Sequence, residues 1–201
     1  WLNEEHFFRT DFFVTWGDLC KDDFIKNGMT TATVIVSGHP VYQVKHQRSL
    51  KFGLENVLVL SNSLNGITPS DDYMLTDRSD CIYYLYLVQD CLSKYGVKSV
   101  RLRPHPSENP EWYKKNIDTS FFHIDSGSVE FSLSNSTLVI GPTSTVFLEA
   151  LYHGVNYVVF NPSNYSGKAL NGLATPPIFN GDNSKVPVAK NQSELNHIIS
   201  N

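Results

Sequence analysis

Residues 137–160 have the sequence TLVIGPTSTVFLEALYHGVNYVVF, which predicts a strand, a helix and a second strand in that order. The apolar, β-rich runs Thr137–Ile140 and Val155–Phe160 predict the strands. Between them we expect a helix at Thr145–Tyr152, which Gly154 ends. Apolar strands joined by a helix are typical of a parallel sheet that is covered on both faces. This segment therefore predicts one unit of such a sheet.

The same alternation of short strands and helices continues along the rest of the chain. We expect further strands at 11–15, 33–37, 57–60, 98–102 and 120–124, helices at 18–27, 77–95, 112–115, 128–133 and 193–200, the last capped by Ser193, and a long loop at 161–185. This order predicts an α/β fold, a Rossmann-like parallel sheet with helices on both faces. Residues 55–201 are expected to form the main domain, and residues 1–54 a lead-in or hinge segment of the same α/β unit.

The composition indicates a globular protein without a broad basic surface. The 201-residue chain has a net charge of −4, which argues against nucleic acid as a partner. Its three cysteines are odd in number and lack metal-ligand spacing, so we expect reduced thiols in the cytoplasm and no metal or cofactor. Neither a membrane span of about 20 apolar residues nor a signal peptide is predicted. Attachment to the inner face of a membrane would then depend on other parts of the protein.

Polar residues follow the predicted strands at the points where the strands end. Ligands of open parallel sheets bind beyond the carboxyl ends of the strands, so we expect these residues to converge on one crevice. They supply a cation, an imidazole, a carboxylate and several hydroxyls: Ser61, Asn62, Ser63, Arg103, Pro104, His105, Pro106, Asp125, Gly141, Pro142, Thr143, Ser144 and Thr145.

Gly141-Pro142 leads from a strand directly into a helix, and the first turn of that helix contains Thr143, Ser144 and Thr145. Free backbone N–H groups and the positive end of the helix dipole favour an anion at such a place, and the hydroxyls add donors. This arrangement predicts a phosphate site. The alternative is ordinary helix capping, for which Ser and Thr are also favoured.

His105 lies between Pro104 and Pro106 on a loop that these prolines stiffen. A histidine there could donate a proton to a departing phosphate, although an isolated His-Pro pair is more often structural. His39, in a second His-Pro pair, is interpreted as a linker residue.

Glu130 and Glu149 are rival candidates for binding the two hydroxyls of a ribose. Glu130 lies one helical turn from the expected crevice. Glu149 lies four residues after Thr145, on the same helix face. Either could instead be a solvated surface residue.

Residues 55–162 resemble the carboxyl-terminal, donor-binding domain of GT-B-fold bacterial glycosyltransferases. The likeness is to the sialyltransferase, polysialyltransferase and Kdo-transferase group, which uses CMP-sugars, and it rests on Arg103-Pro104-His105-Pro106, Glu130 and Thr143-Ser144-Thr145. The opening segment, with Trp16-Gly17, Gly28 and Gly38-His39-Pro40, also resembles CDP-glycerol glycerophosphotransferases.

The resemblance implies roles for individual residues. His105 would contact the CMP phosphate and assist its departure, and Ser144 with a neighbouring Thr would bind the same phosphate. Arg103 would lie near the cytosine and Glu130 would hold the ribose. The implied activity is transfer of an acidic sugar, of the sialic acid or Kdo type, to an oligosaccharide or lipid-linked acceptor, as in capsule polysaccharide synthesis.

The resemblance also implies a second Rossmann-like domain, which we expect to lie outside this sequence, in a longer enzyme or in a partner. Two alternatives to the CMP-sugar hypothesis remain open. One is an enzyme that uses CDP-glycerol or a UDP-sugar, and the other is a nucleotide-binding domain without activity of its own.

Overall fold

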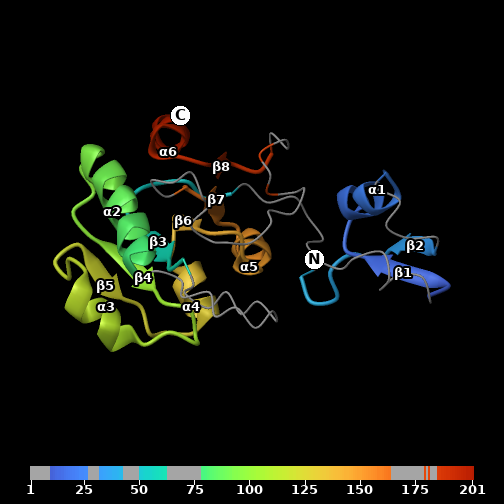
Figure 1. Ribbon diagram of the computed structural model, residues 1–201, viewed down its shortest axis with the longest axis horizontal. Coiled ribbons are helices and arrows are strands. Elements are labelled where there is room, and N and C mark those ends of the chain that lie inside the picture. The colour runs from blue at the N-terminus through green and yellow to red at the C-terminus, as the bar shows by residue number, and fades with distance from the viewer. Residues whose placement is uncertain are drawn as a thin grey trace.

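The computed structural model of the protein describes residues 10–26, 32–42, 50–62, 78–163, 179, 181 and 185–201. Six strands, all parallel, form the main sheet in the order β5-β4-β3-β6-β7-β8 (Figure 1). Their bounds are β3 (Val57–Leu60), β4 (Val100–Arg103), β5 (Phe122–Ile124), β6 (Leu138–Gly141), β7 (Asn156–Phe160) and β8 (Val188–Ala189). The predicted α/β, Rossmann-like class is confirmed.

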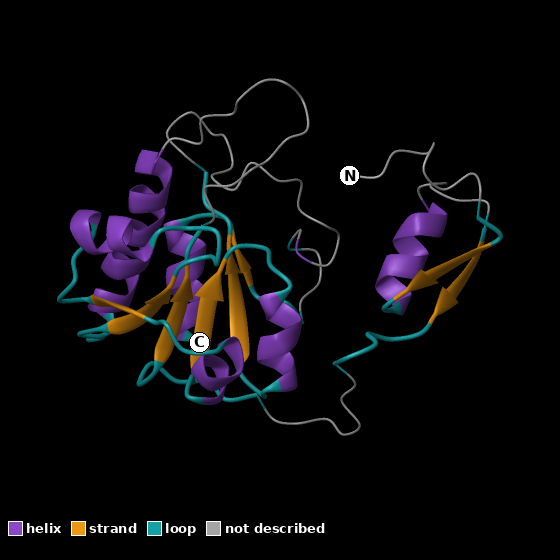
Figure 2. Ribbon diagram, turned by 90° about the horizontal axis from the view of Figure 1, so that it is seen from below, coloured by secondary structure: helices purple, strands orange, loops and turns teal. Residues whose placement is uncertain are grey.

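Helices cover both faces of this sheet (Figure 2). They are α2 (Arg78–Lys94), α3 (Pro110–Asn116), α4 (Val129–Ser134), α5 (Val146–Tyr152) and α6 (Gln192–Ser200). Side chains of α2, α3 and α6 belong to one hydrophobic cluster, and side chains of α4 and α5 belong to the other. Within the described ranges, no helix is long and apolar enough to cross a membrane.

The central strands are apolar because both of their faces are covered. In β3, Val57 and Val59 join the first cluster while Leu58 and Leu60 join the second, which is the two-residue alternation of a strand. All four residues of β3 and all four of β6 are buried. β4 differs, since its buried apolar residues alternate with the half-buried Arg101 and Arg103. Both arginines therefore lie on the same face of the sheet.

The carboxyl-terminal end departs from the predicted elements in two places. α6 begins at Gln192 because Asn191, and not Ser193, is its N-cap: the side-chain oxygen of Asn191 accepts the N–H of Glu194 at 2.9 Å. β8 pairs with β7 although no strand was expected there. With only two residues, β8 shows no alternation that a sequence pattern could reveal.

The amino-terminal elements form a separate two-stranded parallel sheet, made of β1 (Phe12–Thr15) and β2 (Thr33–Val36) and joined by α1 (Asp18–Lys26). Phe13 of β1 packs against Phe24 of α1, with ring centroids 4.8 Å apart. On the strands, Phe12, Val14 and Ile35 alternate with the residues that face α1, and these three residues are exposed by 61%, 55% and 44%. This small sheet is therefore covered by a helix on one face and carries exposed apolar side chains on the other.

Hydrogen bonds to the main sheet begin a few residues before position 55. The N–H of Lys51 donates to the carbonyl of Gly154 at 2.8 Å, and the carbonyl of Lys51 accepts the N–H of Asn156 at 3.1 Å. The hydroxyl of Thr137 donates to the carbonyl of Gly53 at 2.8 Å. The described residues from Lys51 onward are thus bound to the six-stranded sheet.

Gly141 ends β6 at a point where there is no room for a side chain. A Cβ there would overlap the Tyr157 hydroxyl and come within 3.0 Å of Leu60 Cδ1. With glycine at this position, the Tyr157 hydroxyl can donate to the carbonyl of Pro142 at 2.6 Å. This contact fixes the start of the loop that follows β6.

We expect Gly141→Ala to lower the free energy of unfolding by about 1–3 kcal/mol, because a methyl group must displace well-packed atoms. In the double variant with Tyr157→Phe, which removes the nearest atom, the loss should be smaller than the sum of the two single losses. Urea denaturation measures all three changes. Gly17→Ala is the control, since a Cβ at Gly17 has open space around it. An unchanged stability for Gly141→Ala would contradict the packing described here.

Candidate functional site

The strand order reverses between β3 and β6. From β3 the chain crosses to β4 and β5 on one side, and it then returns to β6, β7 and β8 on the other. The loops after β3 and β6 therefore lead away from each other at the carboxyl edge of the sheet, which is where open parallel sheets bind their ligands. Ser61 and Asn62 follow β3, residues 142–144 follow β6, and His105 follows the neighbouring strand β4. The topology brings these predicted site residues to one edge.

His105 and Ser144 lie on loops of strands that both pair with β3. Neighbouring strands are about 4.8 Å apart, so the ends of β4 and β6 are separated by about 10 Å. His105 is exposed and Ser144 is half-buried. Neither residue is enclosed in the interior of the domain.

The His105 loop is bound to the end of β3 through a carboxylate. The backbone N–H of His105 donates to Glu108 Oε2 at 2.8 Å and is 2.9 Å from the Ser61 hydroxyl oxygen. The Ser61 hydroxyl itself donates to the same Glu108 oxygen at 2.5 Å. Ser61, His105 and Glu108 thus form one compact polar cluster.

The imidazole of His105 is oriented by its own loop. Its Nδ1 accepts the backbone N–H of Ser107 at 3.3 Å and lies 2.6 Å from the Ser107 hydroxyl oxygen. In the neutral ring, a nitrogen that accepts an N–H carries no proton, so the ring proton is on Nε2. The nitrogen able to donate to a ligand is therefore Nε2.

The loop after β6 is held by the residue that follows β7. Asn161 donates from Nδ2 to the Thr143 hydroxyl at 2.8 Å, and Asn161 Oδ1 accepts the Thr143 N–H at 3.3 Å. The Ser144 hydroxyl oxygen accepts the N–H of Val146 at 3.3 Å, while Thr145 makes no side-chain cap bond to α5. Ser144 thus makes the kind of bond that the capping alternative predicted, and the phosphate site stays a prediction.

Arg103 points into a network beside α4. Its Nη1 donates to the carbonyl of Gly127 at 2.7 Å and to the Ser132 hydroxyl at 3.2 Å, and it lies 3.6 Å from Asp125 Oδ1. Arg101 Nη1 pairs with Asp125 Oδ2 at 3.2 Å. Two arginines therefore share one carboxylate, whose side chain is only 6% exposed.

The two candidate ribose ligands differ in their surroundings. Glu130 is exposed in the first turn of α4. Glu149 of α5 is a hydrogen-bond partner of Tyr42, and the pKa of Tyr42 is raised first by desolvation and then by the Glu149 charge. The Tyr42 ring also lies near that of Tyr152, 5.6 Å between centroids, and stacks on His39. Glu149 therefore faces the amino-terminal segment.

The remaining predicted site residues are less informative. Pro106 is exposed, Asn62 is buried and its carbonyl accepts a hydrogen bond from the Cys81 thiol at 2.9 Å, and Ser63 lies outside the described residues. Among the residues that the structure describes, no three His, Cys, Asp or Glu side chains are grouped so as to hold a metal ion.

Two residues at the carboxyl edge of the sheet were not predicted from the sequence as site residues. Asn161 directly follows β7, so the rule that selected the other strand-end residues would also have selected it. Glu108 follows His105 by three residues, and its carboxylate bonds back to the His105 N–H. A carboxylate three positions after a loop residue resembles many surface glutamates, so this spacing alone could not identify it.

The fold can be compared with known proteins. No family model matches the chain, and no curated protein matches it in sequence. Among solved structures, the chain is similar to TarM, with a TM-score of 0.50 and 13% sequence identity. The similarity covers 93% of this chain and 35% of TarM. The chain thus spans about a third of the length of that protein.

TarM is a teichoic acid glycosyltransferase, so the chain has a glycosyltransferase-like fold. At 13% identity, the likeness concerns the fold alone. The class that fold and topology define is an α/β domain of the kind found as one half of a GT-B enzyme.

Asp125→Ala would leave Arg101 and Arg103 without their shared carboxylate. We expect the free energy of unfolding to fall by about 2–3 kcal/mol, because the two guanidinium groups are then partly buried without a counter-charge. Chemical denaturation followed by circular dichroism measures the change. In the control, Glu111→Gln removes an exposed ion pair with Lys114 and should cost less than about 0.5 kcal/mol. Equal stability of the two variants would refute the structural role of Asp125.

Proposed function

We propose that this chain is the donor-binding part of a glycosyltransferase and that it holds a nucleotide-activated sugar by its phosphate. The observation that carries the proposal is the convergence of the His105 loop and the Thr143-Ser144 loop on one edge of a parallel sheet, beside the reversal of strand order. The likeness of the fold to TarM supports the glycosyltransferase part of the proposal.

We assign the phosphate to the loop after β6 and to His105. The Thr143 N–H is bound to Asn161, so the donors on this side are the backbone N–H groups of Ser144 and Thr145 and the Ser144 hydroxyl hydrogen. Backbone donors at the start of a helix suit a phosphate oxygen. The Nε2–H of His105 supplies a donor from the other side of the crevice, across the gap of about 10 Å between strand ends.

His105 then donates the hydrogen bond that assists departure of the nucleotide. As the acceptor hydroxyl loses its proton to a base of the acceptor-binding domain and its oxygen bonds to the anomeric carbon of the sugar, the bond from that carbon to the phosphate oxygen breaks. Negative charge then accumulates on the phosphate. An N–H aimed at this oxygen stabilises the charge more in the transition state than in the ground state. The Ser107 contacts keep the imidazole in the orientation that presents Nε2.

For the donor we propose a CMP-activated acidic sugar of the sialic acid or Kdo type. Arg101 and Arg103 share the single carboxylate of Asp125, so this cluster carries an excess of positive charge near the end of β4. A donor with both a phosphate and a carboxylate suits such surroundings better than a neutral sugar does. We assign the ribose to Glu130, because Glu149 is engaged with Tyr42.

We further propose that a second α/β domain supplies the acceptor site. The support is the β1–β2 sheet, which has α1 on one face and the exposed Phe12, Val14 and Ile35 on the other. Parallel sheets are rarely left uncovered on one face, because their strands are apolar on both sides. The occupant that fits this face is the rest of an α/β domain with an oligosaccharide or lipid-linked acceptor, as in the synthesis of a bacterial surface polysaccharide.

The nucleotide site can be tested by thermal unfolding. At a CMP concentration about 100 times the Kd, binding adds about 2.7 kcal/mol to the stability of the folded chain. For a chain of this size we expect a rise in Tm of about 5–10 °C. His105→Ala should remove most of the rise, and the control His197→Ala, on the exposed surface of α6, should retain it.

Thermal unfolding with CMP, CDP and UDP in parallel separates the alternatives. A larger shift with CDP or UDP than with CMP would favour the CDP-glycerol or UDP-sugar enzyme over the CMP-sugar enzyme. Nucleotide binding without turnover, after a second domain is supplied, would favour the binding domain without activity. No shift with CMP, CDP or UDP would refute the proposed site.

A further inference from the structure

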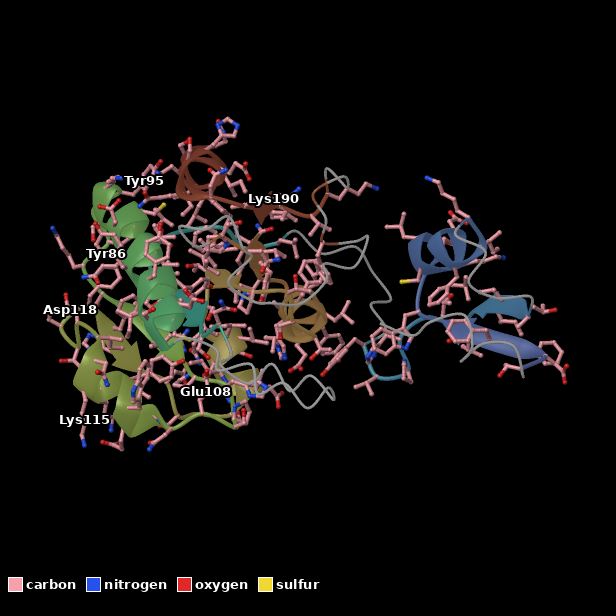
Figure 3. All side chains as sticks on the ribbon, in the orientation of Figure 1. Tyr86, Tyr95, Glu108, Lys115, Asp118 and Lys190 are labelled. Atoms are coloured by element: carbon pink, nitrogen blue, oxygen red, sulfur yellow. The ribbon has the colours of Figure 1, made fainter. Side chains whose placement is uncertain are left out.

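We infer that Glu108 is a positioning residue that holds His105 at the carboxyl edge of the sheet, and that the Ser61 hydroxyl donates its hydrogen bond to this carboxylate and not to the ligand. The inference rests on the proposed function, since it assigns how His105, the proposed hydrogen-bond donor, is held. Glu108 lies on the side of the domain where α3 and α4 are found (Figure 3).

The Glu108 carboxylate connects two loops that belong to different strands. Its Oε2 accepts the N–H of His105, at the end of β4, and the hydroxyl of Ser61, at the end of β3. In return, the backbone N–H of Glu108 donates to the carbonyl of His105 at 2.8 Å. His105 is therefore held through both its N–H and its carbonyl, which fixes the backbone from which the imidazole extends.

The Ser61 hydroxyl has no hydrogen left for a phosphate. A hydroxyl has one hydrogen to donate and two lone pairs to accept with. Ser61 gives its hydrogen to Glu108, and its oxygen lies 2.9 Å from the His105 N–H. A phosphate oxygen needs a donor, so Ser61 is removed from the set of ligand residues that the sequence suggested.

Buried side chains lie beside the Ser61, His105 and Glu108 cluster and strengthen the hydrogen bonds to the Glu108 carboxylate. Tyr113 of α3 and Cys81 of α2 are exposed by only 1% and 3%. Burial first, and the Glu108 charge second, raise the pKa of the Cys81 thiol to about 12. Burial likewise raises the pKa of Tyr113, with smaller contributions from Cys81 and Glu108. The carboxylate thus lies beside a poorly solvated region, where a hydrogen bond to it is stronger than in water.

The matched variants are Glu108→Ala and Glu108→Gln. Gln keeps the volume and one acceptor oxygen, whereas Ala removes both. With 15N-histidine labelling, we expect the backbone amide and ring resonances of His105 to move in Glu108→Ala and to stay near their original positions in Glu108→Gln. By calorimetry, Glu108→Ala should weaken CMP binding on the order of 10-fold, as for the loss of a charge-assisted hydrogen bond, and Glu108→Gln by less than about 3-fold.

Glu111→Gln, an exposed glutamate on α3, is the control and should change neither readout. If Glu108→Ala does not fold, Ser61→Ala provides the second test and should move the same His105 resonances. Unchanged His105 resonances in the folded variants would overturn the inference. If the wild-type chain binds no CMP, the proposed function fails, while the resonances of His105 still decide whether Glu108 holds it.

Discussion

The organisation of the protein depends on one constraint: all six strands of the main sheet run in the same direction. Every strand therefore delivers its following loop to the same edge, and the reversal of order between β3 and β6 separates two of those loops. The helices needed to connect parallel strands also cover both faces, which is why β3 and β6 consist of buried residues. Fold and candidate site thus have a common cause.

The polar groups near this edge hold the loops in place and leave the His105 imidazole accessible to a ligand. Asp125 ties the two arginines of β4 to the loop before α4, and Glu108 ties the His105 loop to β3. Asn161, which follows β7, likewise holds Thr143 in the loop after β6. These bonds satisfy partly buried groups, and they leave the His105 imidazole exposed at the edge. Loops held in this way lose little further entropy when a ligand binds.

The sequence predicted what depends on long apolar patterns and missed what depends on single contacts. β3 (Val57–Leu60) and β7 (Asn156–Phe160) are strands because their apolar runs must be covered on both faces. β8 and the Asn191 cap were not predicted. A two-residue strand is too short to show an alternation of side chains, and Asn and Ser are both favoured caps. Strand-end position identified His105 and Ser144 as candidates. It could not show that Arg103 pairs with Asp125, because that pairing depends on which face of β4 lies against α4.

The central claim, that the loops after β4 and β6 bind one phosphate, is tested most directly by titrating CMP into the 15N-labelled chain. The account predicts that the amide resonances of His105, Ser144 and Thr145 shift together with a single Kd. Those of Lys98 and Ser99, which precede β4 at the opposite edge of the sheet, should stay in place. Shifts confined to one of the two loops, or spread to Lys98 and Ser99, would contradict it.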